Sequence, residues 1–220
     1  MSTETRDRLK LTAKGARTRA RIVDAAAQLI HERGVASATL DDVRAAAEVS
    51  GSQLYHYFAD KDELVQAVID RQADTILGNQ RQADLGSLEG LSAWRDMVIA
   101  LVASGEAKGG CPLGSLGGQL AEVNPEARAL IAAGFDRWSS VIADGLRNLH
   151  AAGQLAGGID PDDLAVTLLA ALQGGLLLAQ VQRDPRPLET ALDTLIALAS
   201  GGASAQRGDS PAQAEASAPH

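Results

Sequence analysis

The window from Thr39 to Leu64 constrains the fold more than any other part of this 220-residue chain. It reads TLDDVRAAAEVSGSQLYHYFADKDEL, and it holds three of the six aromatic residues within four positions: Tyr55, Tyr57 and Phe58. One short apolar pattern of helical period ends at Ala47, a polar turn follows, and a second pattern begins near Ser50. Two short helices joined by a turn, the second rich in Ser, Gln, Tyr and His, predict a helix-turn-helix that reads DNA.

The rest of the sequence predicts an all-α protein. Strand-like alternation of β-branched residues is absent, and Ala, Leu, Gln, Glu and Arg dominate. Four of the seven prolines directly follow a Cys, Asn or Asp and are typical helix openers: Pro112, Pro125, Pro161 and Pro185. These signals predict helices over about 18–33, 39–47, 50–57, from 60 to beyond 76, and over 88–104, 112–123, 125–152, 161–183 and 186–200.

Changes in pattern along the chain predict four parts. They are a flexible basic arm (1–16), a helix-turn-helix DNA-binding domain (17–62), a helical ligand-binding and dimerisation domain (63–201) and a disordered tail (202–220). The tail is small, polar and contains proline, which is typical of segments that cannot form a packed core.

Charge is unevenly spread along the chain. The net charge is −8, yet the first 21 residues carry seven basic and two acidic side chains, a net +5 that leaves −13 for the remainder. A basic segment on an acidic body fits a protein that touches phosphate at one end only. A solvated tail is the alternative.

Cysteine content and hydropathy suggest a compartment. A single cysteine excludes an intramolecular disulfide, and the first residues offer no apolar core for a signal peptide. The uncharged stretch 164–182 approaches the roughly 20 residues of a membrane span. It also contains Thr167, three glutamines and a Gly-Gly pair, so a helix buried against other helices is the better interpretation. We expect a cytoplasmic protein with no membrane partner.

The helix-turn-helix window also resembles a known family. Eleven positions fit the DNA-binding signature of TetR/AcrR-type one-component transcriptional regulators: Thr39, Val43, Ala47, Val49, Ser50, Leu54, Tyr55, Tyr57, Phe58, Lys61 and Leu64. The segment GCPLGSL at 110–116 and the run at 172–188 are similar to the LmrA/YxaF-like branch. The resemblance implies a three-helix DNA-binding domain followed by a helical ligand-binding and dimerisation domain.

Two positions depart from the family pattern. Glu48 stands in the turn where the family usually has Gly, and a non-Gly residue in the left-handed region costs about 1 kcal/mol. Gly51 and Ser52 also come in the reverse of the usual order. We therefore expect either a strained turn or one of different shape, and base contacts that differ in detail.

In this family's fold the third helix enters the major groove. Its implied DNA-facing residues are Ser50, Gly51, Ser52, Gln53, Tyr55 and His56. Gln53 is the best candidate for reading a base, because an amide pairs bidentately with adenine. Lys61 begins the fourth helix, where its ammonium and the helix amides suit phosphate.

The resemblance also implies backbone or minor-groove contacts from Arg17, Arg19 and Arg21, and a phosphate contact from Thr39. A helix cap is the alternative role for Thr39. His56 is alternatively a solvated surface residue. Tyr57 and Phe58 fit the core better than the DNA.

The C-terminal half would form a helical cavity for an effector. Trp94, Cys111, Phe135 and Trp138 are the predicted effector contacts, and ordinary core packing is the alternative role of the three aromatic residues. Cys111 precedes Pro112 at an expected helix N-cap, where a thiol can have a lowered pKa. A thiol-based redox or electrophile sensor is therefore one alternative, and a small buried cysteine at a helix start is the other.

The histidines lack the Cys or carboxylate spacing of a metal site, and neither a nucleophile motif nor a phosphate-binding loop is present. We expect no metal, no cofactor and no enzymatic activity. An all-helical ligand carrier or enzyme remains the competing class.

A leucine stripe at i, i+4 spacing over 164–176 predicts that the last two helices pair with a second copy. The predicted dimer contacts are Leu168, Leu172, Gly175, Leu176, Leu192 and Leu195. A twofold dimer implies a palindromic double-stranded DNA operator. The sequence thus predicts a homodimeric repressor that a small-molecule effector releases from DNA.

Overall fold

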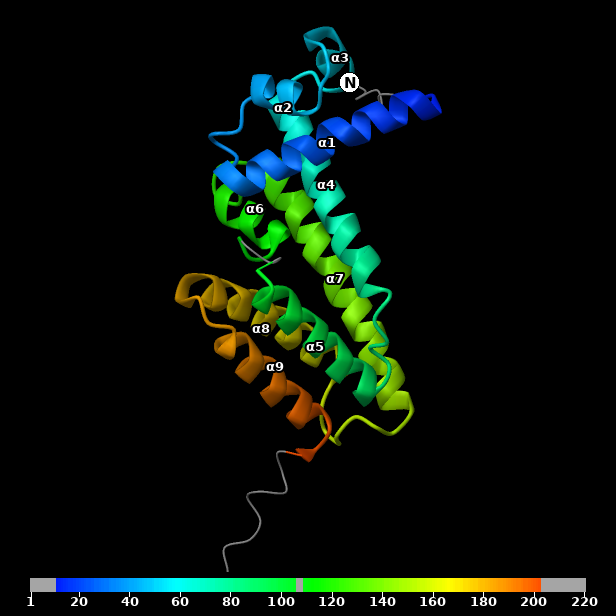
Figure 1. The fold of residues 1–220 in the computed structure, drawn as a ribbon. Coiled ribbons are helices and arrows are strands. Elements are labelled where there is room, and N and C mark those ends of the chain that lie inside the picture. The colour runs from blue at the N-terminus through cyan, green and yellow to red at the C-terminus, as the bar shows by residue number, and fades with distance from the viewer. Residues whose placement is uncertain (1–10, 106–108, 203–220) are drawn as a thin grey trace, which may run out of the picture. The chain divides into compact units, whose positions relative to one another are not determined.

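The computed structural model describes residues 11–105 and 109–202, and every regular element within them is an α-helix (Figure 1). The helices are α1 (Ala13–Arg33), α2 (Leu40–Ala46), α3 (Gly51–Tyr57), α4 (Lys61–Gln80), α5 (Leu88–Ala103), α6 (Pro112–Leu120), α7 (Pro125–Ala151), α8 (Pro161–Gln182) and α9 (Arg186–Ala199). The predicted all-α class is confirmed. Most of the predicted arm (1–10) and tail (203–220) lies outside the described residues.

Polar caps fix most of the predicted helix starts. The Asn124 side chain accepts the Ala127 amide at 2.9 Å, and Asp160 accepts the amides of Asp162 and Asp163 at 2.8 and 3.1 Å. Each bond satisfies an amide that has no carbonyl partner within the first turn. These starts are as predicted from the Asn-Pro and Asp-Pro pairs.

One start differs from the prediction. Helix α1 begins at Ala13 rather than Thr18, because Thr12 accepts the Gly15 amide at 3.1 Å and the basic first turns are good helix formers. Helix α9 begins at Arg186 as predicted, although Pro185 precedes the helix at the N-cap position instead of opening it. Arg183 adopts a left-handed φ of 57° at the end of α8, and the chain turns back there.

The described chain divides into two compact units. The first unit comprises residues 11–79 and 109–138, with α1 to α4, α6 and the start of α7. The second unit comprises 80–105 and 139–202, with α5, the rest of α7, α8 and α9. The first unit thus groups α4 and α6 with the helix-turn-helix, and the predicted domain boundary after residue 62 stays a prediction.

In the second unit, α9 packs along both α8 and α5 (Figure 1). Arg95 of α5 joins α9 by donating to both carboxylate oxygens of Asp193, at 2.7 and 2.9 Å. Hydrogen bonds to Asp193, and then to Asp96, hold the pKa of Arg95 above its ordinary value. Where α8 meets α9, Gly175 lies against Leu188, so close that a Cβ on the glycine would stand 2.6 Å from a Leu188 methyl.

This packing involves the residues of the predicted dimer contacts, which stay a prediction. Leu168, Leu172 and Leu192 are 1%, 2% and 0% exposed within a single subunit, and Gly175 is buried as well. Leu176 and Leu195 are half-buried. The leucine stripe therefore holds α8 inside its own chain, because a periodic apolar face does not distinguish an internal neighbour from a second copy.

A different face of α8 is open. The buried face carries Leu164, Leu168, Leu172, Gly175 and Ala179, and the residues two positions further along are exposed: Val166, Ala170, Gly174, Leu177 and Val181. Two residues correspond to about 200° around a helix, so these are opposite faces. We call the second set the exposed stripe of α8. By length and composition α8 also qualifies as a membrane span, a test that core helices pass too.

Candidate DNA-recognition surface

A capping box starts α2. The Thr39 hydroxyl accepts the Asp42 amide at 3.1 Å, while Asp42 accepts the Thr39 hydroxyl at 2.6 Å and its amide at 3.2 Å. The hydrogen bond that Asp42 accepts from the Thr39 hydroxyl, and to a smaller extent the one from the Thr39 amide, hold the pKa of Asp42 below its ordinary value. The predicted cap is confirmed. Because the hydroxyl donates to Asp42, a phosphate contact by Thr39 has to compete with this bond.

The turn between α2 and α3 contains a residue with left-handed backbone geometry, and this residue is not glycine. Glu48 has a φ of 52°, and its amide donates to the Ala45 carbonyl at 3.2 Å. The next amide, that of Val49, donates to the Arg44 carbonyl at 3.2 Å. Ala47 and Val49 are both buried on either side of the glutamate. The turn therefore bears the strain that the sequence implied, with burial of its flanking residues to offset it.

A second capping box starts α3 and involves the predicted base reader. Ser50 Oγ accepts the Gln53 amide at 3.2 Å, and Gln53 Oε1 accepts the Ser50 amide at 2.9 Å. The hydroxyls of Ser50 and Ser52 share a further hydrogen bond at 3.0 Å. Bidentate pairing with adenine needs both ends of the Gln53 amide, so it would open this cap. With the cap intact, Gln53 offers only its Nε2 donors to a base.

Buried side chains hold α3 in place. Leu54 and Phe58 are 1% and 0% exposed. Tyr57 is half-buried, and its hydroxyl lies 3.3 Å from the position that a Cβ on Gly15 of α1 would occupy. The guanidinium of Arg19 lies 5.1 Å from the centre of the Phe58 ring, which makes Arg19 part of the packing between α1 and α3 as well as a basic surface residue.

The remaining predicted residues of α3 face outward. Ser52, Gln53 and His56 are exposed, and Tyr55 is 60% exposed although its ring is mostly apolar. An exposed aromatic ring beside polar side chains on a short, firmly anchored helix is suited to contact base edges and thymine methyl groups.

Basic groups lie on the neighbouring elements of the same unit. Arg17 and Arg21 are exposed on α1. Lys61, at the start of α4, is half-buried and donates from Nζ to the Ala36 carbonyl at 3.3 Å. Sequence reasoning missed this bond, which ties the predicted phosphate contact to the loop between α1 and α2.

The same loop is held from α6 by a residue that sequence reasoning did not single out. Gln119 Oε1 accepts the Val35 amide at 2.7 Å, directly after Gly34, whose φ is 81°. A Cβ at Gly34 would stand 3.0 Å from Gln119 Oε1. No local pattern signals a bond between residues 84 positions apart. It links α6 to the loop that leads into the helix-turn-helix.

The predicted effector contacts fall in both units. Trp94, in the second unit, is 3% exposed and donates from Nε1 to Gln80 at 3.2 Å. Phe135 and Trp138, in the first unit, stack with ring centres 6.4 Å apart. Cys111 is buried there, and its Sγ accepts the Gly114 amide at 3.4 Å as the cap of α6. Their role in binding an effector stays a prediction.

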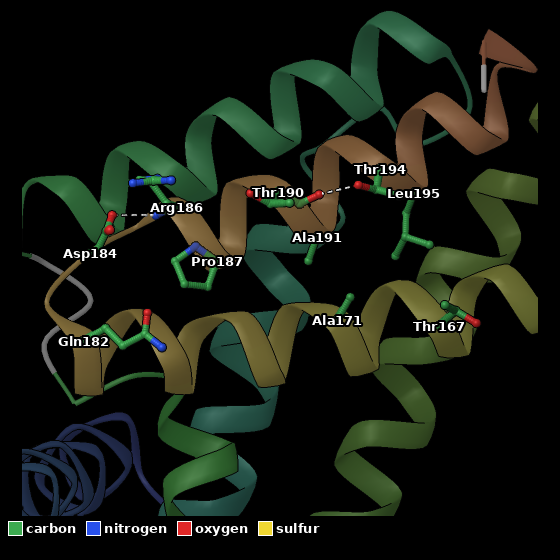
Figure 2. A pocket seen from close by; sticks show the side chains of 10 residues that line it. All are labelled: Thr167, Ala171, Gln182, Asp184, Arg186, Pro187, Thr190, Ala191, Thr194 and Leu195. Atoms are coloured by element: carbon green, nitrogen blue, oxygen red, sulfur yellow. Dashed lines mark hydrogen bonds between the residues drawn. The ribbon is translucent and has the colours of Figure 1, made fainter. Parts of the chain in front are cut away.

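A groove of about 760 Å³ runs between α8 and α9 in the second unit (Figure 2). It is lined by Thr167, Ala171, Gln182, Asp184, Arg186, Pro187, Thr190, Ala191, Thr194 and Leu195. Figure 2 shows Asp184 beside Arg186 at the end where α8 turns into α9. The groove contains none of the four predicted effector contacts and one of the predicted dimer contacts, Leu195.

A helix-turn-helix with an exposed recognition helix, in an otherwise helical chain, defines a DNA-binding transcriptional regulator. Residues 22–68 match the family model of bacterial regulatory proteins, tetR family, and residues 87–195 match the tetracyclin repressor-like C-terminal domain. The chain belongs to the TetR family. The more specific similarity to the LmrA/YxaF-like branch stays a prediction.

Relatives and solved structures agree with this family. An HTH-type transcriptional regulator of Mycobacterium tuberculosis is 32% identical over 180 residues, covering 78% of this chain and 88% of the relative. The transcriptional regulator AcuR of Cereibacter sphaeroides is 28% identical, covering 77% and 79%. A crystal structure of a regulatory protein TetR from Rhodobacter sphaeroides is 25% identical with a TM-score of 0.73, covering 82% of this chain and 98% of that one.

Proposed function

We propose that this regulator is a cytoplasmic repressor that binds a palindromic operator as a homodimer and dissociates when a small-molecule effector binds. The observation that carries the proposal is the recognition face of α3, where Ser52, Gln53, Tyr55 and His56 are exposed above the fully buried Leu54 and Phe58. A short helix anchored in this way presents polar side chains to a groove without rearranging its core.

The roles on DNA follow from the geometry. Gln53 Nε2 donates to an acceptor on a base edge, and Ser52 and Tyr55 lie on the same exposed face. Gly51 and Ser50 at the helix start allow close approach of the backbone, and His56 adds a further polar contact. Lys61, Arg17, Arg19 and Arg21 bind phosphate, which supplies affinity independent of sequence.

The dimer surface that we propose is the exposed stripe of α8. Val166, Leu177 and Val181 are 60%, 59% and 72% exposed on this face. Large apolar side chains repeated along one helix face are typical of contact surfaces. A twofold pair of such faces places two recognition helices about one helical turn of DNA apart, or slightly more.

Release by an effector is a shift of population between two dimer geometries. Two relatives support a ligand-responsive repressor. The repressor DhaR of Mycobacterium sp. GP1 is 25% identical over 175 residues, and the A-factor receptor protein of Streptomyces griseus is 27% identical over 168 residues. The hydrogen bond that the Val35 amide donates to Gln119 Oε1 connects α6 directly to the loop before α2.

An electrophoretic shift on the DNA upstream of the protein's own gene tests the DNA-binding part. We expect a saturable shift at low salt that weakens for Gln53→Ala and Lys61→Ala. Arg186→Ala, which removes an exposed charge from the second unit, is the matched control and should bind as the wild type does. Absence of any shift, or equal binding by all three variants, contradicts the proposal.

Light scattering after size exclusion tests the dimer. Leu177→Asp combined with Val181→Asp should convert the dimer to a monomer that remains helical. Val123→Asp introduces the same kind of charge at an apolar residue that is 75% exposed in the first unit, and it should stay dimeric. A double variant that remains dimeric places the interface elsewhere.

A further inference from the structure

Helix α8 contains a buried amide nitrogen, Nε2 of Gln173, that has no hydrogen-bond partner in the part of the chain that the structure describes. Among the residues that the structure describes, no protein acceptor lies within hydrogen-bonding distance of Gln173 Nε2, although the atom is shielded from solvent. Other polar side chains of the second unit are engaged: Thr167 donates to the Asp163 carbonyl at 2.8 Å, and the Gln80 amide accepts the Trp94 indole at 3.2 Å. Gln173 is therefore an exception that calls for an explanation.

The surroundings of Gln173 on its own helix are apolar. Leu172 directly before it is 2% exposed, Leu169 one turn back is 8% exposed, and Leu176 one turn ahead is half-buried. A leucine at position 173 would suit this helix equally well and would leave no donor unpaired. The amide is thus unfavourable for folding in the free protein and favourable only with a partner.

We infer that Gln173 donates a hydrogen bond from Nε2 to a neutral carbonyl oxygen of the effector, such as that of a ketone, ester or amide. The inference rests on the proposed ligand-responsive function and adds the chemistry of the ligand. The stretch from 164 to 182 has no charged side chain. A carboxylate next to Gln173 would find no cation on this helix to offset its desolvation, whereas a neutral carbonyl needs only one donor and apolar surroundings.

The test uses pairs of probes that differ in one group. The probes are methyl ketones of about six to twelve carbons, which cover the size range of a small apolar ligand. Each ketone is compared with the 2-methyl-1-alkene in which C=CH₂ replaces C=O. Binding is followed by thermal shift and by release of the operator duplex. We expect the wild type to bind at least one ketone about tenfold more tightly than its alkene. This preference should disappear in Gln173→Leu, which should still bind the alkene.

Gln180→Leu is the matched control, because position 180 is seven residues further along α8 and so lies on the same helix face, and its amide is not an unpaired buried group. It should retain the ketone preference. Gln173→Met checks that loss of preference does not come from leucine's shape. A wild type that binds no ketone, binds ketone and alkene equally, or keeps its preference in Gln173→Leu overturns the inference. The operator shift without probe tests the repressor proposal separately, so the two failures are distinguishable.

Discussion

Adjacent glycines on α8 provide a matched test of how this helix is packed. At Gly175 an added Cβ would stand 2.6 Å from Leu188 Cδ1 and 2.9 Å from its Cα, whereas at Gly174 no atom of the described residues lies within 4 Å. Alanine gains about 1 kcal/mol of helix propensity at either position. At Gly175 overpacking costs about 2–3 kcal/mol, because Leu188 is fully buried and its backbone cannot yield without moving α9.

The free energy of unfolding should therefore fall by about 1–2 kcal/mol in Gly175→Ala and rise by about 1 kcal/mol in Gly174→Ala. Each kcal/mol corresponds to about 2–4 °C in Tm for a chain of this size. Urea unfolding followed by circular dichroism, at one subunit concentration, measures both. Gly118→Ala on α6 is a second control, away from the exposed stripe of α8, and also meets no atom within 4 Å. Gly174 belongs to the exposed stripe of α8, so Gly118→Ala is the deciding control: if Gly175→Ala and Gly118→Ala shift stability in the same direction, Gly175 does not pack against Leu188 in this way.

Three further predictions concern the caps and the loop before α2. Because Thr39 lowers the pKa of Asp42, this cap stabilises the fold above the pKa of an unfolded aspartate, about 3.9, and the contribution is lost as pH falls through the lower, folded value. In Thr39→Val the NMR titration midpoint of that carboxyl should rise, and an unchanged midpoint refutes the assigned cause. Gln119→Leu removes the bond to Val35, so we expect operator affinity to persist while effector-driven release weakens by up to about tenfold; unchanged release in a reporter assay would exclude this coupling. Cys111→Ser retains an acceptor for the α6 cap, and the variant should respond to its effector as the wild type does, whereas loss of a response to oxidants in a gel-shift assay would support the thiol sensor instead.

Sequence patterns predicted the helices well where a cap or a proline marks an end. Asn124 and Asp160 each cap a helix within one residue of the predicted start. The start of α1 was predicted five residues late, because its first two turns carry basic side chains and no apolar periodicity. The signal at Thr12 was a single capping residue, which is weak without an apolar face to follow.

The candidate site was predicted less completely, since its details depend on contacts between distant residues. That Gln53 faces outward follows from its place beside Leu54, and this is what the structure shows. That its carbonyl oxygen folds back onto the Ser50 amide was also readable, as a Ser-x-x-Gln capping box. The bonds of Lys61 to Ala36 and of Gln119 to Val35 had no such local signal.

The leucine stripe of α8 shows what a periodic pattern leaves undetermined. It correctly predicts an apolar helix face, and Leu168 and Leu172 are indeed buried. Which helix covers that face depends on the order in which α5, α8 and α9 pack, and Gly175 serves close approach within the chain. Leu177 and Val181 are among the apolar residues that a second copy could contact. The sequence does not distinguish them from the buried leucines, because this helix is apolar nearly all round.

Operator specificity of Gln53→Ala tests the central claim most directly. Affinities of wild type and variant are measured by fluorescence anisotropy, at one salt concentration, for the operator and for duplexes with each base pair of a half-site replaced. If α3 reads DNA through Gln53, replacing one base pair costs the wild type about 1–3 kcal/mol, and the variant loses discrimination at that position while keeping it elsewhere. A variant that binds every duplex more weakly by the same factor, or discriminates as the wild type does, contradicts the assignment of α3 and Gln53 to base recognition.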